Sequence, residues 1–306
     1  MSAISATSIG SLRTIASDIK LAHSVFALPF ALLAAFMAAA PVNATIDWGR
    51  LGIQLILVIL AMIFARTTAM LANRLLDREI DARNPRTAGR AIPSGRLPVP
   101  VAMAALAASA ALFVVVCATF GWLFDNWWPL VLAIPVLAWL SAYPLLKRFT
   151  VACHIYLGAS LAISPIAAAL AVAPSSIATQ PALWCIAGMV LLWVAGFDVI
   201  YALQDASIDR TEGLHSVPGR FGERTARRIS LVLHVGAMAC LIASLLSDDR
   251  FGAIYGTGVA LVIGLLIYEH ATVARWGTTR IALAFFTVNG VISCLLGTLG
   301  IVDVLV

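Results

Sequence analysis

Charged residues are scarce in this chain: they make up 11% of its 306 residues, whereas about a quarter is usual for a globular domain. Hydrophobic residues account for 61%, and the mean hydropathy is +0.97. So little charge cannot cover the surface of an ordinary soluble domain. The composition therefore excludes that class and predicts an integral membrane protein that crosses the bilayer several times.

A disulfide framework and a zinc site are also missing from the sequence. Its five cysteines are odd in number, far apart and embedded in apolar runs, which is typical of small packing residues. The basic residues form no stripe of the kind that binds nucleic acid, because they fall in loops between apolar runs. We therefore predict no nucleic-acid partner, and no protein partner is indicated.

Apolar runs follow one another almost from end to end. The first, from Leu21 to Ala40, is longer than the core of a signal peptide and has no well-placed cleavage site after it, so we expect it to be retained. The runs predict an all-α protein of nine transmembrane helices, at about 22–40, 51–75, 101–123, 128–146, 151–173, 182–204, 229–246, 252–269 and 281–302.

The connections between these helices are unequal, and two of them, 74–100 and 205–228, are long and rich in charge. If the N-terminus is cytoplasmic, both lie on the cytoplasmic side. Of the 20 lysines and arginines, only Arg50, Arg66 and Arg250 then lie elsewhere. This bias predicts a multi-pass protein of the cytoplasmic membrane with its functional residues on the cytoplasmic side. The net charge of +5 suits anionic lipid and an anionic substrate equally.

Two acidic runs stand where an apolar helix reaches that face. In the first, Asn73, Asp77 and Asp81 share one helical stripe, and Arg66 lies on the same stripe two turns deeper. The second run keeps its polar side chains within about 80° of one face of the sixth helix: Asp198, Tyr201, Asp205 and Asp209. Ionisable residues at such positions are costly, which makes each a candidate for function.

Facing stripes of carboxylates repel each other, and a divalent cation between them relieves the repulsion. Oxygen-only ligands favour a hard cation such as Mg²⁺, which prefers a few carboxylates together with substrate phosphates. Arginines beside both runs could bind phosphate oxygens: Arg83, Arg86, Arg90 and Arg96, and then Arg210, Arg220 and Arg224. The alternative is that each aspartate forms an interfacial ion pair with a neighbouring arginine, without a metal.

One offset along the chain separates Asp77 from Asp205 and Asp81 from Asp209. It hints at an internal duplication, in which helices one to four are repeated by helices five to eight and a ninth is added. We treat residues 1–306 as a single transmembrane domain that contains this pseudo-repeat.

At these residues the chain resembles the UbiA superfamily of membrane aromatic prenyltransferases. The first motif reads Asn73-Arg74-Leu75-Leu76-Asp77-Arg78-Glu79-Ile80-Asp81 and continues to Gly95. The second runs from Tyr201 through Asp205 and Asp209 to Gly213 and Ser216. One position departs from the family pattern, since Arg74 stands where an aspartate is frequent. The aspartates at four-residue spacing remain, so metal binding is still expected.

The resemblance implies a role for each matching residue, in a cavity that faces the cytoplasm and opens sideways to lipid. Residues expected to hold Mg²⁺ and the diphosphate are Asn73, Asp77, Asp81, Asp205 and Asp209. Residues expected to help bind substrate are Lys20, His23, Arg83, Arg86, Arg90, Asp198, Arg210 and Ser216. Residues expected nearest the chemistry are Arg66, Tyr143, Lys147 and Tyr201.

The implied activity is Mg²⁺-dependent transfer of a prenyl group, geranyl or longer, from its diphosphate to a ring carbon of an aromatic acceptor. The expected acceptor is 4-hydroxybenzoate, in quinone-type or meroterpenoid biosynthesis. A dihydroxynaphthoate on a menaquinone route and a hydroxyquinoline remain alternatives. A membrane transporter is the alternative of another class. A CDP-alcohol phosphotransferase is disfavoured because neither charged loop resembles its motif.

Overall fold

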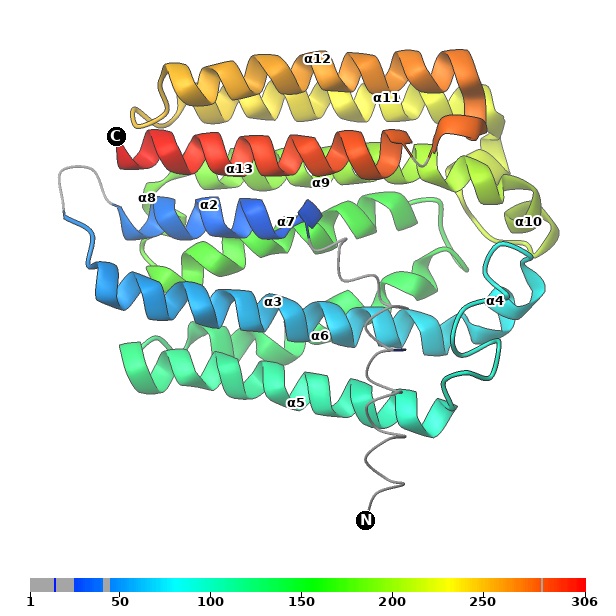
Figure 1. Cartoon of the computed structure of the whole chain (residues 1–306), viewed down its shortest axis with the longest axis horizontal. Coiled ribbons are helices and arrows are strands. Elements are labelled where there is room, and N and C mark those ends of the chain that lie inside the picture. The colour runs from blue at the N-terminus through cyan, green and yellow to red at the C-terminus, as the bar shows by residue number, and fades with distance from the viewer. Residues whose placement is uncertain (1–13, 15–24, 41–44, 282) are drawn as a thin grey trace.

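The computed structural model describes residues 14, 25–40, 45–281 and 283–306, and no β-strand occurs among them (Figure 1). Lys20 and His23 lie outside the described residues. The described chain is a bundle whose helices run side by side along the long axis of the molecule (Figure 1). The predicted all-α class is confirmed.

In the described part of the chain, eight helices are long and apolar enough to cross a membrane. They are α3 (Trp48–Leu76), α5 (Val99–Phe124), α6 (Trp128–Leu146), α7 (Cys153–Val172), α9 (Pro181–Tyr201), α11 (Val217–Leu246), α12 (Ala253–Trp276) and α13 (Asn289–Leu305). A shorter apolar helix, α2 (Leu28–Ala39), precedes them. Together they agree with the nine predicted segments.

Short elements join the long helices. They are α4 (Arg78–Arg83), α8 (Ser176–Thr179), the 3-10 turn η2 (Ala202–Asp205), α10 (Ala206–Thr211), the 3-10 turn η3 (Gly277–Arg280) and the π-helical turn η4 (Leu283–Val288). Of these, α4, η2 and α10 carry the last aspartates of the two acidic runs, which begin on α3 and α9.

Several helix ends follow from local side-chain chemistry. Asp47 caps α3 by accepting the Arg50 N–H at 3.0 Å, and Ser216 caps α11 by accepting the Gly219 N–H at 3.1 Å. From this cap α11 begins well before the apolar run predicted at 229–246, with a kink at Gly222, whose φ of 79° is not helical. Its first turns carry arginines, which a search for apolar segments overlooks.

The core lies between α2, α7, α9 and α13, with Trp193 of α9 at its centre. The Trp193 ring is fully buried and meets Phe26 and Phe30 edge to face, at centroid distances of 6.5 and 5.7 Å. Its indole N–H donates to the side-chain oxygen of Asn289 on α13 at 2.7 Å. A buried polar atom is thus satisfied where no water is available.

Close helix packing also depends on small residues. A Cβ on Gly158 of α7 would lie 2.1 Å from the carbonyl oxygen of Leu191 on α9. The two backbones therefore touch at this point, as small residues permit in membrane bundles. This contact fixes the separation of α7 and α9, which both carry site residues at the same end.

The two charged connections lie at one end of the bundle, where α4 and α10 are neighbours, and the C-terminus lies at the other end (Figure 1). That opposite end is tied together by Arg250. Its guanidinium bonds to Asp248 at 2.6 and 2.8 Å, to the Met37 carbonyl at 2.9 Å and to Gln180 at 3.1 Å, and it also reaches the Ala40 carbonyl. Arg250 thus joins α2, α9 and the turn before α12.

Candidate active site

The first acidic run occupies the end of α3 and the start of α4. The Asp77 N–H bonds to the Asn73 carbonyl at 3.0 Å, which closes the last turn of α3. Asn73, Asp77 and Asp81 are all buried, at 6%, 1% and 4% exposure. Buried carboxylates require compensating charge, because the desolvation of an unpaired ion is costly.

Cations from the same chain supply that charge. The Lys147 Nζ lies 2.6 Å from Oδ2 of Asp77, and Nη2 of Arg148 lies 3.3 Å from Oδ1. One nitrogen of Arg90 lies 2.7 Å from both oxygens of Asp81. In this arrangement Arg90, a predicted phosphate ligand, and Lys147, a residue expected nearest the chemistry, are each paired with a predicted metal ligand.

The second acidic run meets the first loop directly. Asp205 accepts hydrogen bonds from Asn84 at 3.1 Å and from the Nε of Arg86 at 2.8 Å, and it receives a second bond from Arg86. Arg86 also donates to the Tyr201 hydroxyl at 3.3 Å. Burial alone would lower the pKa of Arg86, but its hydrogen bond with Asp205 and the charge of Asp205 raise the pKa overall. Arg86 therefore stays cationic.

A second contact joins the same two loops. The Arg83 Nε donates to both oxygens of Glu212 at 2.9 Å, and its Nη2 donates to one of them at 2.6 Å. This fork-like pairing raises the pKa of Arg83 and lowers the pKa of Glu212, chiefly through the hydrogen bond itself.

Tyr143 lies at the centre of the first cluster. Its hydroxyl accepts a long hydrogen bond of 3.5 Å from Asn73, and it is close enough to Asp77 and Asp198 to interact electrostatically with both. The predicted pair of Tyr143 and Lys147 on α6 therefore lies beside the first acidic run.

The second loop is held by its own turn chemistry. Gly213 adopts a φ of 67°, which lets the Leu214 N–H reach back to the Asp209 carbonyl at 2.7 Å and end α10. Ser216, besides capping α11, lies beside the Asp209 side chain. Arg210 points within this loop, to the Gly219 carbonyl at 3.3 Å.

His154 is a site residue that sequence reasoning missed. It lies at the start of α7, and its Nδ1 is 2.7 Å from Asp198 on α9. Its Nε2 accepts the N–H of Val217 at 3.2 Å. No motif marks this histidine, and only the packing of α7 against α9 and α11 brings it to Asp198.

The donor types suit Mg²⁺, but the carboxylates do not surround one position. Among the described residues, no three aspartate, glutamate, histidine or cysteine side chains are placed to share a metal ion. Asp77, Asp81 and Asp205 each face a lysine or arginine instead, which is the ion-pair alternative. Their oxygen-only chemistry fits a hard cation once these basic side chains move away. The shared metal site remains a prediction.

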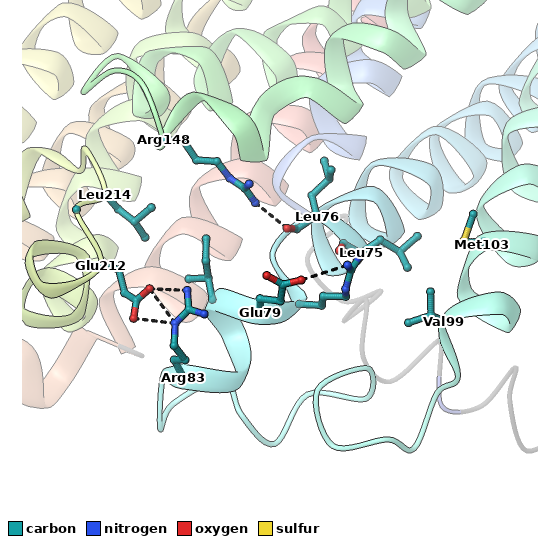
Figure 2. Close-up of a pocket in the computed structure, with 12 residues that line it drawn as sticks. Leu75, Leu76, Glu79, Arg83, Val99, Met103, Arg148, Glu212 and Leu214 are labelled. Atoms are coloured by element: carbon teal, nitrogen blue, oxygen red, sulfur yellow. Dashed lines mark hydrogen bonds and ion pairs between the residues drawn. The ribbon is translucent and has the colours of Figure 1, made fainter.

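A cavity of about 620 Å³ lies beside this cluster, between α4, the start of α5 and the turn after α10 (Figure 2). Leu75, Leu76 and Met103 form apolar parts of its wall, and Arg83 and Glu212 lie at its charged side. Arg148 also lines it, while donating to the Leu76 carbonyl at 2.6 Å. Arg148 thus stands between the cavity and Asp77.

The sequence profile of the UbiA prenyltransferase family matches residues 27–296. The chain belongs to this family. The predicted membership and the predicted prenyltransferase class are thereby confirmed.

Named relatives and solved structures are similar over most of the chain. A 4-hydroxybenzoate octaprenyltransferase of Saccharophagus degradans is 30% identical over 73% of this chain and 70% of its own length. A 4-hydroxybenzoate octaprenyltransferase of Shewanella frigidimarina is 29% identical over 71% of this chain and 72% of its own length. The apo structure of a UbiA homolog from Aeropyrum pernix K1 is 30% identical, with a TM-score of 0.79 over 92% of this chain and 98% of that one.

A UbiA homolog from Archaeoglobus fulgidus, solved with GPP and Mg²⁺, shares the fold at 18% identity. Its TM-score is 0.70 over 96% of this chain and 100% of that one.

The remaining arginines singled out in the sequence lie on α3, on α11 and in the first motif loop. Arg66 is half-buried within α3, and Arg220 and Arg224 are exposed on α11. Arg96 donates to the Gly89 carbonyl at 2.6 Å, so it braces its own loop. Residues that sequence reasoning left out, besides His154, are Asn84, Arg148 and Glu212.

Proposed function

We propose that this protein transfers a prenyl group from its diphosphate to a ring carbon of an aromatic acceptor, with 4-hydroxybenzoate as the acceptor and Mg²⁺ as the cofactor. The observation that carries the proposal is the meeting of the two family motifs at one end of the bundle, through Asn84, Arg86 and Asp205. The names of the relatives from Saccharophagus and Shewanella support the acceptor. The Archaeoglobus homolog bound to GPP and Mg²⁺ supports the donor and the metal.

In this proposal, the metal ligands are the amide of Asn73 and the carboxylates of Asp77, Asp81, Asp205 and Asp209. Bound Mg²⁺ would supply positive charge to the leaving diphosphate. In the structure, Asp77, Asp81 and Asp205 are paired with basic side chains. Binding of Mg²⁺ and the diphosphate would therefore replace these ion pairs. Lys147, Arg86 and Arg90 leave the aspartates and become available to the diphosphate oxygens. A bidentate guanidinium matches phosphate geometry well.

The residues around the reacting bond then have separate tasks. Tyr143 and Lys147 lie beside the leaving group, and Tyr201 stands next to Arg86 at 3.3 Å. Arg66 lies deeper in the bilayer, toward the prenyl chain or the acceptor. An allylic cation is captured by water unless water is excluded, and the apolar helices around the site serve that purpose.

Placement in the membrane follows from the distribution of charge. We propose that the protein lies in the cytoplasmic membrane with its N-terminus and both motif loops on the cytoplasmic side. Donor and acceptor would then reach the site from the bilayer and from the cytoplasm, respectively. Dihydroxynaphthoate and hydroxyquinoline acceptors use the same chemistry, so they belong in the same assay.

The test is an activity screen on purified protein in detergent. It combines Mg²⁺, geranyl diphosphate or longer donors, and a panel of hydroxybenzoate, dihydroxynaphthoate and hydroxyquinoline acceptors. Asp77→Ala and Asp205→Ala should abolish the product, as should EDTA. Asp125→Asn is the matched control, because Asp125 lies at the opposite end of α5. If no donor gives product, and neither mutation affects substrate binding, the transporter becomes the better hypothesis.

A further inference from the structure

The tautomer of His154 is set by its two partners. A backbone N–H can only donate, so the 3.2 Å contact with Val217 makes Nε2 an acceptor. The proton of a neutral imidazole then resides on Nδ1, which donates to Oδ2 of Asp198 at 2.7 Å. The ring is 4% exposed, so water does not compete for either bond.

Asp198 differs from the other acidic residues of the site. Asp77, Asp81 and Asp205 are each paired with a lysine or arginine, so a cation already occupies each of these carboxylates. Among the described residues, Asp198 has no such cation, and no hydrogen bond reaches its Oδ1. Its side chain is 23% exposed and lies within electrostatic range of Tyr143. One oxygen is thus fixed by His154, and the other accepts no hydrogen bond from the described residues.

We propose that His154 is a positioning residue: it holds Asp198 in the orientation in which Oδ1 takes the proton that the aromatic acceptor loses. This inference rests on the proposed function. In the step, the acceptor ring carbon bonds to C1 of the prenyl group as the C1–O bond breaks. The diphosphate leaves with the electron pair, and the proton from that ring carbon passes to Asp198. Orientation of a base by a third group is a general catalytic device.

The two hydrogen bonds of His154 also allow a structural role to be separated from a positioning role. The bond to Val217 ties α7 to the start of α11, and the bond to Asp198 ties α7 to α9. If His154 has only a structural role, removing either bond should lower the melting temperature of the protein. If His154 positions Asp198, kcat should fall only when the bond to Asp198 is removed.

Three substitutions separate these bonds. In His154→Asn the amide nitrogen takes the place of Nδ1 and keeps the donor to Asp198. In His154→Gln the amide oxygen takes the place of Nε2 and keeps the acceptor for Val217. His154→Phe removes both. For each variant, kcat, the KM of both substrates and the melting temperature are measured, with His270→Asn as a control on a half-buried histidine away from the site.

We expect kcat to fall by about 100-fold in His154→Gln and His154→Phe, the scale of a general-base contribution, with the diphosphate KM unchanged. His154→Asn should retain kcat within about threefold, since the remaining amide donor still orients Asp198. Asp198→Asn should match the loss in His154→Phe, and the double variant should lose nothing more.

The role of His154 is overturned if His154→Gln turns over as fast as His154→Asn, or if kcat follows the melting temperature across the series. A wild-type protein that binds Mg²⁺ and geranyl diphosphate but prenylates no acceptor would overturn the proposed function, and this inference with it. Product formation by the wild type separates the two failures.

Discussion

Arg83 and Glu212 form a forked ion pair between the two motif loops, with nitrogen–oxygen distances of 2.6 to 2.9 Å. Neither residue belongs to the carboxylate clusters, and both line the adjoining cavity (Figure 2). Arg83 is a predicted substrate ligand, and in this structure its guanidinium is bonded to Glu212. The pair therefore joins the two motif loops through residues other than the predicted metal ligands.

Breaking this pair should loosen the first loop with little effect on global stability, because exposed ion pairs contribute little to folding. In Glu212→Gln we expect faster amide hydrogen exchange across 84–96 and an unchanged melting temperature. Arg83→Glu combined with Glu212→Arg should restore protection. Unchanged exchange in the single variant would contradict a loop-joining role.

The same pair predicts that the first loop loses protection at acidic pH but not at neutral or mildly alkaline pH. Because the hydrogen bond with Arg83 lowers the pKa of Glu212, the pair contributes above the unfolded pKa of a glutamate, about 4.3, and its contribution is lost as pH falls through the lowered value. Protection of 84–96 should be constant from about pH 8 to pH 5, because the unfolded and the lowered pKa of Glu212 both lie below that range. The acid-induced loss should be absent in Glu212→Gln, and a change near neutral pH would refute the assignment.

Lys147→Gln should reveal the exchange of partners at Asp77. The Asp77 side chain is 2% exposed, so removing its cation costs on the order of 3 kcal/mol in the metal-free protein. Mg²⁺ no longer has to displace a lysine and can compensate the same carboxylate. The rise in melting temperature on adding Mg²⁺ should thus be larger in Lys147→Gln than in the wild type. Lys147→Arg is the control, and equal shifts would exclude the exchange.

Arg250→Ala should destabilise the protein without altering its chemistry. Arg250 bonds to Asp248, Gln180 and the end of α2, and its side chain is 12% exposed. Loss of charged hydrogen bonds of this kind costs about 2 kcal/mol. The melting temperature should fall while kcat per folded molecule is retained, since the site lies at the other end. A fall in kcat at low temperature would indicate coupling between the ends.

Gly158→Ala should force α7 and α9 apart, because its new methyl group would lie 2.1 Å from a backbone oxygen. Overpacking against a rigid backbone costs about 3 kcal/mol. The matched control is Gly264→Ala on α12, where a Cβ meets nothing within 4 Å and the change favours the helix. Equal melting temperatures in the two variants would contradict the close contact.

Much of this protein was predictable from local sequence. Apolar runs long enough to cross a bilayer are expected to be helical, because a helix satisfies the hydrogen bonds of every backbone N–H and C=O within the segment. The four-residue spacing of Asn73, Asp77 and Asp81 places them on one face whatever the surrounding fold. The motifs around Asp77 and Asp205 were sufficient to indicate the family.

Only the tertiary structure decided which basic side chain pairs with which carboxylate. Lys147 is distant in sequence from Asp77 and yet lies 2.6 Å from it, and Arg86 reaches Asp205 across two loops. His154 carries no motif at all, and it became a site residue only because Gly158 lets α7 approach α9 closely. Helical periodicity fixes the face on which a side chain lies. Its partner depends on how the helices pack, through contacts between segments that local sequence does not encode.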